Sequence, residues 1–343
     1  MKSQEIILNE KRNVSLTSYI QEVDGEFGFF KRPAMLVIPG GGYAMCSDRE
    51  ADPVAMAYLK AGYQAFVLRY TCTPMGKWPL PLEDYEQAMT LIEERADEWH
   101  LDKTKIAVAG FSAGGHLAAC AATVAEHKPA AAVLVYPAIL KDICDMCQPG
   151  MPYPNEHVTA KTCPCFFAAA RDDRAVDISN TLRMELALAE KGVAFESHIY
   201  SYGGHGFSTG EDWINTNSIC PRLPRWVPDS IEWLGEVMGK LTRKGFTEPT
   251  AAISMNGNFA PVLSVNCTLS HLRIQSEGAK TVLAPMFAAV EAVAKARKYS
   301  AEGLMTAVGN STAREIMEMV QIPAETIAEI DKALHQMINE LED

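Results

Sequence analysis

One serine lies in a glycine-rich setting that suits nucleophilic chemistry. Ser112 stands between Gly110 and Gly114 in the pattern G-x-S-x-G. An apolar run, 105–108, precedes this pattern and an alanine-rich run, 117–125, follows it, which predicts a sharp turn from a strand into a helix. Glycine at both positions removes the Cβ atoms that would collide at such a turn. The pattern therefore predicts a serine hydroxyl held clear of a sheet at the positive end of a helix.

A carboxylate and an imidazole follow later strands of the same predicted sheet. Asp172 and Asp173 come directly after the apolar run 165–170, and His205 follows a predicted strand at 195–202. Serine, then aspartate, then histidine is the chain order of an acyl-transfer triad on a doubly wound fold. An imidazole activates a serine by accepting its proton, and a carboxylate orients the imidazole. Asp173 is the predicted triad acid, and Asp172 is expected to stabilise the turn.

A run of glycines follows the first predicted parallel strand. Gly40, Gly41 and Gly42 come directly after the apolar run 34–38 and Pro39. Ligands bind at the carboxyl ends of strands in open α/β sheets. Backbone N–H groups of this loop could therefore face a developing oxyanion.

These motifs together resemble those of α/β-hydrolase esterases over roughly residues 20–240. The runs that carry the resemblance are PGGGY at 39–43, GFSAGGH at 110–116, RDDRAV at 171–176 and GGHGF at 203–207. The chain is most similar to the bacterial acetyl xylan esterase and carbohydrate or feruloyl esterase-like group. The resemblance implies that Ser112 is the nucleophile, His205 the general base and Asp173 the acid. It also implies an oxyanion hole made by the N–H groups of Gly41, Gly42 and Ala113.

Two positions depart from the pattern of the related enzymes. Pro39 stands where the lipase motif usually begins with histidine, and Asp177 stands where related enzymes often have proline. Asp177 places another carboxylate close to the predicted triad acid. His116, on the elbow helix, is expected to pack or to hydrogen-bond without taking part in catalysis.

Four aromatic residues fall near the predicted strand ends and are the candidate substrate-binding residues. These are Tyr43, Trp78, Tyr136 and Phe207. Aromatic side chains at these places could wall a small acyl or sugar pocket. They are equally compatible with ordinary packing.

The alternation of strands and helices predicts an α/β fold with a doubly wound, mostly parallel sheet. Residues 1–245 form the predicted catalytic domain, and 138–162 a lid-like insertion. Residues 246–343 form a predicted, mainly helical appendage after a linker at 244–249. The last predicted helix, 324–341, carries an apolar face that is expected to pack on the hydrolase or on a second subunit, giving a homo-oligomer. Further predicted helices are 82–99, 178–191, 230–240, 282–298 and 312–320, and 261–274 is left open between a strand and an irregular segment.

Composition narrows the classes of partner. The 343 residues are 48% hydrophobic and carry a net charge of −12, which gives no support for nucleic-acid binding. The sequence contains no apolar run of about 18 residues, which is the length that would predict a membrane span. It also shows no signal-peptide pattern, so the protein is expected to be cytoplasmic. Nine cysteines are most simply reduced and buried. A zinc site formed by Cys144, Cys147, Cys163 and Cys165 is the minor alternative.

The resulting expectation is a serine esterase that removes acetyl or similar short acyl groups from carbohydrates, with no metal or organic cofactor. A prolyl oligopeptidase-like peptidase and an arylformamidase are the enzymatic alternatives. A scaffold acting through the helical tail is the non-enzymatic one.

Overall fold

The computed structural model describes residues 1–23, 25–74, 77–215, 219–251, 257–260 and 262–339. The chain divides into two compact units, Met1–Ile253 and Ser254–Asp343. The first unit extends beyond the predicted boundary at 245 because Thr247 and Thr250 donate backbone hydrogen bonds to Lys240 and Glu236. In the part of the chain that the structure describes, no helix has the length and apolar character needed to cross a membrane.

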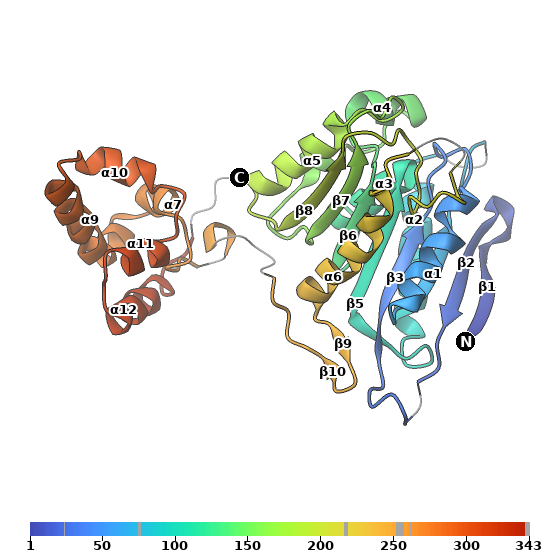
Figure 1. Cartoon of the computed structure of the whole chain (residues 1–343), viewed down its shortest axis with the longest axis horizontal. Helices are drawn as coiled ribbons and strands as arrows, with labels where there is room; N and C mark the ends of the chain where they lie inside the picture. The colour runs from blue at the N-terminus through green and yellow to red at the C-terminus, as the bar shows by residue number, and fades with distance from the viewer. Residues whose placement is uncertain (24, 75–76, 216–218, 252–256, 261, 340–343) are drawn as a thin grey trace. The chain divides into compact units, whose positions relative to one another are not determined.

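An eight-stranded sheet forms the centre of the first unit (Figure 1). Its order is β1-β2-β4-β3-β5-β6-β7-β8, with β1, β2 and β4 paired antiparallel and every pair from β4 to β8 parallel. This confirms the predicted mostly parallel sheet. The strands are β1 Lys2–Asn9, β2 Val14–Ile20, β3 Arg32–Ile38, β4 Gln64–Arg69, β5 Leu101–Phe111, β6 Ala131–Val135, β7 Cys165–Ala170 and β8 Phe195–Tyr200.

Helices cover both faces of this sheet, which explains why its central strands are apolar throughout. Side chains of α2, α3 and α5 pack in the core on one face, and those of α1 and α6 in the core on the other. A short hairpin, β9 Leu241–Thr242 with β10 Gly245–Phe246, follows α6, and its second strand lies in the predicted linker at 244–249. The helices are α1 Asp52–Lys60, α2 Leu80–Glu94, α3 Ser112–Thr123, α4 Lys141–Cys147, α5 Ser179–Glu190 and α6 Trp226–Met238.

Two helices differ from their predicted bounds. α2 ends at Glu94, although the prediction ran to residue 99. Ala96 and Trp99 are buried and continue the apolar periodicity, but they lie in turns that end at His100, which has a positive φ of 52°. α6 begins at Trp226, ahead of the predicted start at 230.

The segment between β6 and β7, predicted to be lid-like, packs into the core of the unit. It contains α4 and a 3-10 turn, Pro154–His157. Cys144, Met151 and Val158 are buried in the same cluster as the side chains of α2 and α3. The segment is therefore anchored at several points along its length.

The second unit consists of six helices within its described residues and has a core of its own. The helices are α7 Leu269–Ile274, α8 Glu277–Val282, α9 Ala284–Arg297, α10 Ala301–Ala307, α11 Ala313–Met319 and α12 Ala324–Leu334. α7 lies in the segment 261–274, which the sequence left open between a strand and irregular structure. The capping box predicted at Thr312 is present.

The apolar face of the last helix, which was expected to pack on another surface, is largely buried within the second unit itself. Ile327, Ile330 and Leu334 of α12 are buried within the unit's own core, so their burial requires neither the first unit nor a second subunit. The helix also ends at Leu334, before the predicted end at 341, which lies outside the described residues. Ile338 follows the helix and is 81% exposed.

Two halves of the second unit repeat at a spacing of 44 residues. Thr268 and Thr312 cap α7 and α11 in the same way and pair with each other in an antiparallel bridge. Their flanking hydrogen bonds are reciprocal: Leu269 donates to the Ser311 carbonyl, and Ala313 donates to the Cys267 carbonyl. The buried positions repeat with the same spacing in the pairs Leu269 and Ala313, Leu272 and Ile316, Leu283 and Ile327, Met286 and Ile330, and Val290 and Leu334. The stretch from α7 to α9 and the stretch from α11 to α12 thus share one pattern of capping and burial, and α10 lies between them.

Candidate active site

Ser112 lies at the junction of β5 and α3, as the glycine pattern predicted. Its φ is 52°, in the left-handed region that a non-glycine residue adopts only when its surroundings hold it there. A Cβ on Gly110 would lie 2.3 Å from the Gly114 carbonyl oxygen, and one on Gly114 would lie 2.2 Å from the Ile38 carbonyl oxygen. Only glycine fits at both places, and the close packing projects Ser112 from the start of the helix.

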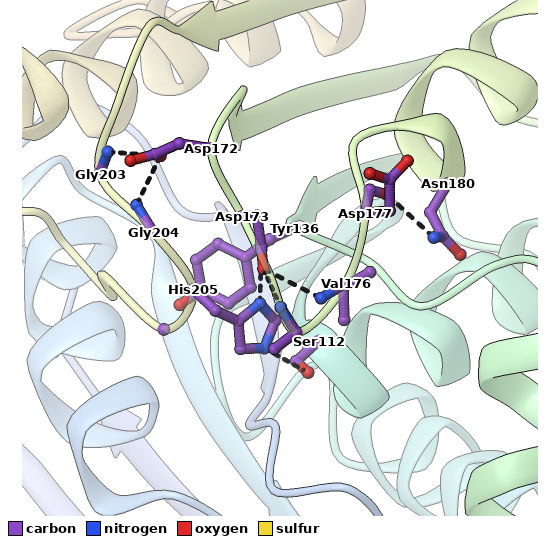
Figure 2. Close-up of polar contacts among 12 residues, drawn as sticks. Ser112, Tyr136, Asp172, Asp173, Val176, Asp177, Asn180, Gly203, Gly204 and His205 are labelled. Atoms are coloured by element: carbon purple, nitrogen blue, oxygen red, sulfur yellow. Dashed lines mark hydrogen bonds and ion pairs between the residues drawn. The ribbon is translucent and has the colours of Figure 1, made fainter.

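His205 bridges Ser112 and Asp173 (Figure 2). Its Nε2 lies 2.9 Å from Ser112 Oγ, and its Nδ1 lies 2.6 Å from Asp173 Oδ2. A carboxylate only accepts, so Nδ1–H donates to Asp173 and Nε2 accepts from the serine hydroxyl. The side chain of Asp173 is 2% exposed and that of His205 is 24% exposed. The carboxylate is therefore buried, whereas the imidazole beside Ser112 is partly accessible.

The three neighbouring aspartates have different partners, which separates their roles. The other oxygen of Asp173 accepts from the N–H groups of Ala175 and Val176, each at 2.9 Å. Asp172 instead accepts from the N–H groups of Gly203 and Gly204 and so fixes the turn before His205. Asp177 accepts from the N–H of Ser179 at the start of α5, and Figure 2 shows its carboxylate away from His205. That hydrogen bond lowers the pKa of Asp177.

The glycine loop lies directly beside the nucleophile. A Cβ on Gly40 would be 3.0 Å from Ser112 Cβ, and Gly41 and Gly42 adopt positive φ values of 134° and 61°. Within the described residues, the N–H groups of Gly41, Gly42 and Ala113 donate to no protein acceptor. Ala113 lies in the first turn of α3, where helical N–H groups lack intrahelical partners. These groups are therefore available to an oxyanion.

His116, which was expected to pack or to hydrogen-bond, is fully buried on α3 and makes two hydrogen bonds. Its Nε2 lies 2.9 Å from the Pro152 carbonyl and therefore donates, so Nδ1 accepts from the Tyr43 hydroxyl at 2.7 Å. Burial lowers the pKa of His116 to about 4, so the ring is neutral at pH 7. The histidine thus connects the elbow helix to Tyr43, which follows the glycine loop, and to the segment between β6 and β7.

The structure buries three of the four predicted substrate-binding aromatics. Tyr43, Tyr136 and Phe207 are each at most 1% exposed, so their rings pack inside the protein rather than facing an open pocket. Trp78 is half-buried, with its ring edge-on to His116 at 5.5 Å between centroids. Trp78 is therefore the one of the four that keeps accessible surface.

A buried glutamate that the sequence analysis did not single out joins these parts. Glu50 accepts from the Gly40 N–H at 2.8 Å and from the Tyr136 hydroxyl at 2.7 Å. Tyr136 in turn packs against His205. An acidic residue in the run Ser47-Asp48-Arg49-Glu50 has the sequence character of an exposed helix start, and only the fold reveals its partners.

The four cysteines of the alternative zinc site do not form a metal-binding cluster. Among the residues that the structure describes, no group of three or more His, Cys, Asp or Glu side chains is arranged to hold an ion. Cys144 and Cys165 are fully buried in the apolar core, and burial raises the pKa of the Cys144 thiol to about 12. Thiols in such surroundings behave as small apolar groups.

Comparison with known proteins defines the family. Residues 29–149 match the BD-FAE family. The crystal structure of MGS-M1, an α/β-hydrolase enzyme from a Medee basin deep-sea metagenome library, is 38% identical with a TM-score of 0.65. That match covers 69% of this chain and 98% of MGS-M1. The chain therefore belongs to the α/β-hydrolase family.

Two curated relatives are linked by name to xylan. Endo-1,4-beta-xylanase B of Butyrivibrio fibrisolvens is 32% identical over 212 residues, which are 53% of this chain and 33% of the relative. Acetylxylan esterase of Xylanibacter ruminicola is 28% identical over 219 residues, which are 57% of this chain and 45% of the relative. The chain thus spans between a third and a half of the length of these relatives.

Proposed function

We infer that the protein is a serine esterase that hydrolyses short-chain acyl esters, with acetylated carbohydrates or xylo-oligosaccharides as its substrate class. The observation that carries this inference is the hydrogen-bonded series from Ser112 through His205 to Asp173 at the start of α3. The name of the acetylxylan esterase supports acetyl as the acyl group, and the names of both relatives support a xylan-type carbohydrate as the substrate.

The proposed mechanism follows from the hydrogen-bond directions. Ser112 Oγ attacks the ester carbonyl carbon while His205 Nε2 takes the hydroxyl proton. Asp173 keeps the proton of the resting ring on Nδ1 and stabilises the imidazolium. His205 then gives its proton to the leaving alcohol. In the second half of the reaction it deprotonates a water molecule, which attacks the acyl carbon, and it then returns that proton to Ser112 Oγ as the acid product leaves.

The oxyanion of each tetrahedral intermediate needs donors that are in place before charge develops. The N–H groups of Gly41, Gly42 and Ala113 are the proposed donors. Gly41 and Gly42 follow Gly40, on which a Cβ would lie 3.0 Å from Ser112 Cβ, and Ala113 directly follows Ser112. None of the three donates to a protein acceptor within the described residues. Each donor lost from such a site typically lowers the rate by about 100- to 1,000-fold.

A substrate panel tests the function and its alternatives. We expect turnover of 4-nitrophenyl acetate to exceed that of longer 4-nitrophenyl esters, and acetate to be released from acetylated xylo-oligosaccharides. Faster cleavage of a dipeptidyl anilide would instead indicate a prolyl oligopeptidase-like peptidase, and faster cleavage of an N-formylated arylamine would indicate an arylformamidase. No turnover of any member of the panel would favour a scaffold.

A further inference from the structure

A buried carboxylate lies at the centre of the proposed catalytic site without contacting the triad. Glu50, at the end of the 3-10 turn Asp48–Glu50, is 4% exposed. Each of its oxygens accepts one neutral donor, the Gly40 N–H at 2.8 Å and the Tyr136 hydroxyl at 2.7 Å. Among the described residues Glu50 has no ion pair. A buried carboxylate destabilises the fold unless its oxygens accept hydrogen bonds. Both hydrogen bonds of Glu50 are therefore expected to hold Gly40 and Tyr136 firmly in place.

The first hydrogen bond fixes the glycine loop where it comes closest to the nucleophile. Gly40 directly precedes the proposed donors Gly41 and Gly42. A Cβ on Gly40 would lie 2.6 Å from the Phe111 carbonyl oxygen and 3.0 Å from Ser112 Cβ. A shift of Gly40 would therefore move both donors relative to Ser112.

The second hydrogen bond reaches the loop that carries His205. The Tyr136 hydroxyl donates to Glu50 and accepts from the Ser208 N–H at 2.9 Å, while its ring lies edge-on to the imidazole at 4.9 Å between centroids. Arg49 strengthens the same connection, because its guanidinium donates to the Gly206 carbonyl at 2.7 Å and its own carbonyl accepts from the Ser208 hydroxyl.

Tyr136 and Ser208, which link Glu50 to the His205 loop, both have strained backbones. Tyr136 and Ser208 have φ values of 37° and 50°, in the left-handed region. Such conformations persist only when surrounding interactions hold them, and they cluster at functional sites. The hydrogen bonds to Glu50 and to the Tyr136 hydroxyl provide that support.

We propose that Glu50 is a positioning residue for the esterase reaction, setting the glycine loop and the His205 loop in one geometry around Ser112. This proposal rests on the proposed function. The groups that Glu50 positions act on charge that develops only in the transition state. Losing Glu50 therefore lowers kcat and leaves KM nearly unchanged.

Two variants and one matched control test the proposal. Glu50→Met keeps the side-chain volume and removes both acceptors, and we expect kcat for 4-nitrophenyl acetate to fall about 100-fold with KM within about threefold. Glu50→Gln retains an oxygen that can accept from Gly40, so a smaller loss, about tenfold, is expected. Asp48→Asn changes an exposed acid in the same turn, which pairs with Arg69, and should keep wild-type kcat.

Folding is checked separately from catalysis. Rates are measured at least about 15 °C below the melting temperature of each variant, so that every chain is folded. A lower melting temperature with kcat within twofold of wild type would overturn the proposal, as would a fall in kcat equal in Asp48→Asn and Glu50→Met. An inactive wild-type protein would instead overturn the proposed function itself, which keeps the two failures distinct.

Discussion

Asp173, His205 and Ser112 are joined by two hydrogen bonds. Because the imidazole donates to Asp173 through Nδ1, its Nε2 is left to accept from the Ser112 hydroxyl. Asp173 is held by two backbone N–H groups and so presents one fixed oxygen to the imidazole. That fixed oxygen selects the tautomer of His205 that can accept the serine proton. The backbone around residues 173–176 therefore contributes to the proposed mechanism as directly as the three side chains.

Substitution of the aspartates tests which carboxylate completes the series. Asp173→Asn should lower kcat about a thousand-fold or more, because an amide cannot hold the imidazole in the required tautomer. Asp177→Asn, which changes an acid that accepts from the Ser179 N–H at the start of α5, should leave kcat within a few-fold of wild type. Steady-state rates on 4-nitrophenyl acetate make the comparison. A larger loss in Asp177→Asn would contradict the assignment of the acid.

The residue types of the triad could be predicted from the sequence, because the motifs around Ser112 and His205 restrict the backbone as well as the side chain. Asp173 was the predicted acid, and the different hydrogen-bond partners that distinguish it from Asp172 and Asp177 are not determined by spacing alone. Glu50 could not be found in this way, since its two partners lie 10 and 86 residues away in the chain. Its role depends entirely on how the loops meet.

At the scale of elements, α3 connects the elbow to its surroundings through His116. The ring joins Tyr43, which follows the glycine loop, to Pro152 of the segment between β6 and β7. Because the ring is fully buried and makes no ion pair among the described residues, it is held in its neutral form. Protonation of this ring would place an unpaired charge in the core.

This burial predicts a pH dependence of stability. The pKa of His116 is about 4 in the folded chain and about 6.5 when exposed, so the unfolded chain binds more protons between these values. The free energy of unfolding is therefore highest, with respect to this group, above about pH 6.5, and it falls as the pH drops toward 4. Between pH 7 and pH 5 the loss from this group should be about 2 kcal/mol.

Chemical denaturation at the two pH values, compared with His116→Gln, isolates the contribution of the ring. The glutamine variant cannot titrate in this range, so its free energy of unfolding should fall less than that of the wild type by about 2 kcal/mol. Equal falls in the two proteins would show that His116 does not have the depressed pKa.

Element boundaries were less predictable than element types. The prediction extended α2 to residue 99 because Ala96 and Trp99 continue its apolar pattern, yet the structure buries both side chains from turns. Burial requires an apolar side chain but does not require a helix. Tyr43, Tyr136 and Phe207 are buried for a similar reason, because a ring near a strand end can point into the core as readily as out of it.

At the scale of the whole molecule, two separate cores account for the two units. The helical unit buries its apolar residues in a cluster of its own, so α12 does not depend on another surface. The 44-residue repeat escaped the sequence analysis because the two copies share little beyond the pattern Asn-x-Thr at 266–268 and 310–312. The repeated burial and the reciprocal backbone bonds make it evident.

Truncation tests this separation. A chain that ends at Ile253 keeps the hairpin and the hydrogen bonds of Thr247 and Thr250, and should keep wild-type esterase activity and melt within about 3 °C of the hydrolase transition of the full chain. A chain that ends at Gly245 loses those bonds and should melt lower. Calorimetry together with esterase rates measures both effects. A large drop in melting temperature on removal of 254–343 alone would contradict the account.

The most direct test of the account measures turnover of 4-nitrophenyl acetate by the purified Ser112→Ala variant. The substitution removes one oxygen at an accessible elbow, so the fold should be unchanged, as circular dichroism and the melting temperature would verify. We predict that kcat falls at least about a thousand-fold, because the proposed acyl-enzyme cannot form. Retention of more than a few per cent of wild-type turnover would show that Ser112 is not the nucleophile.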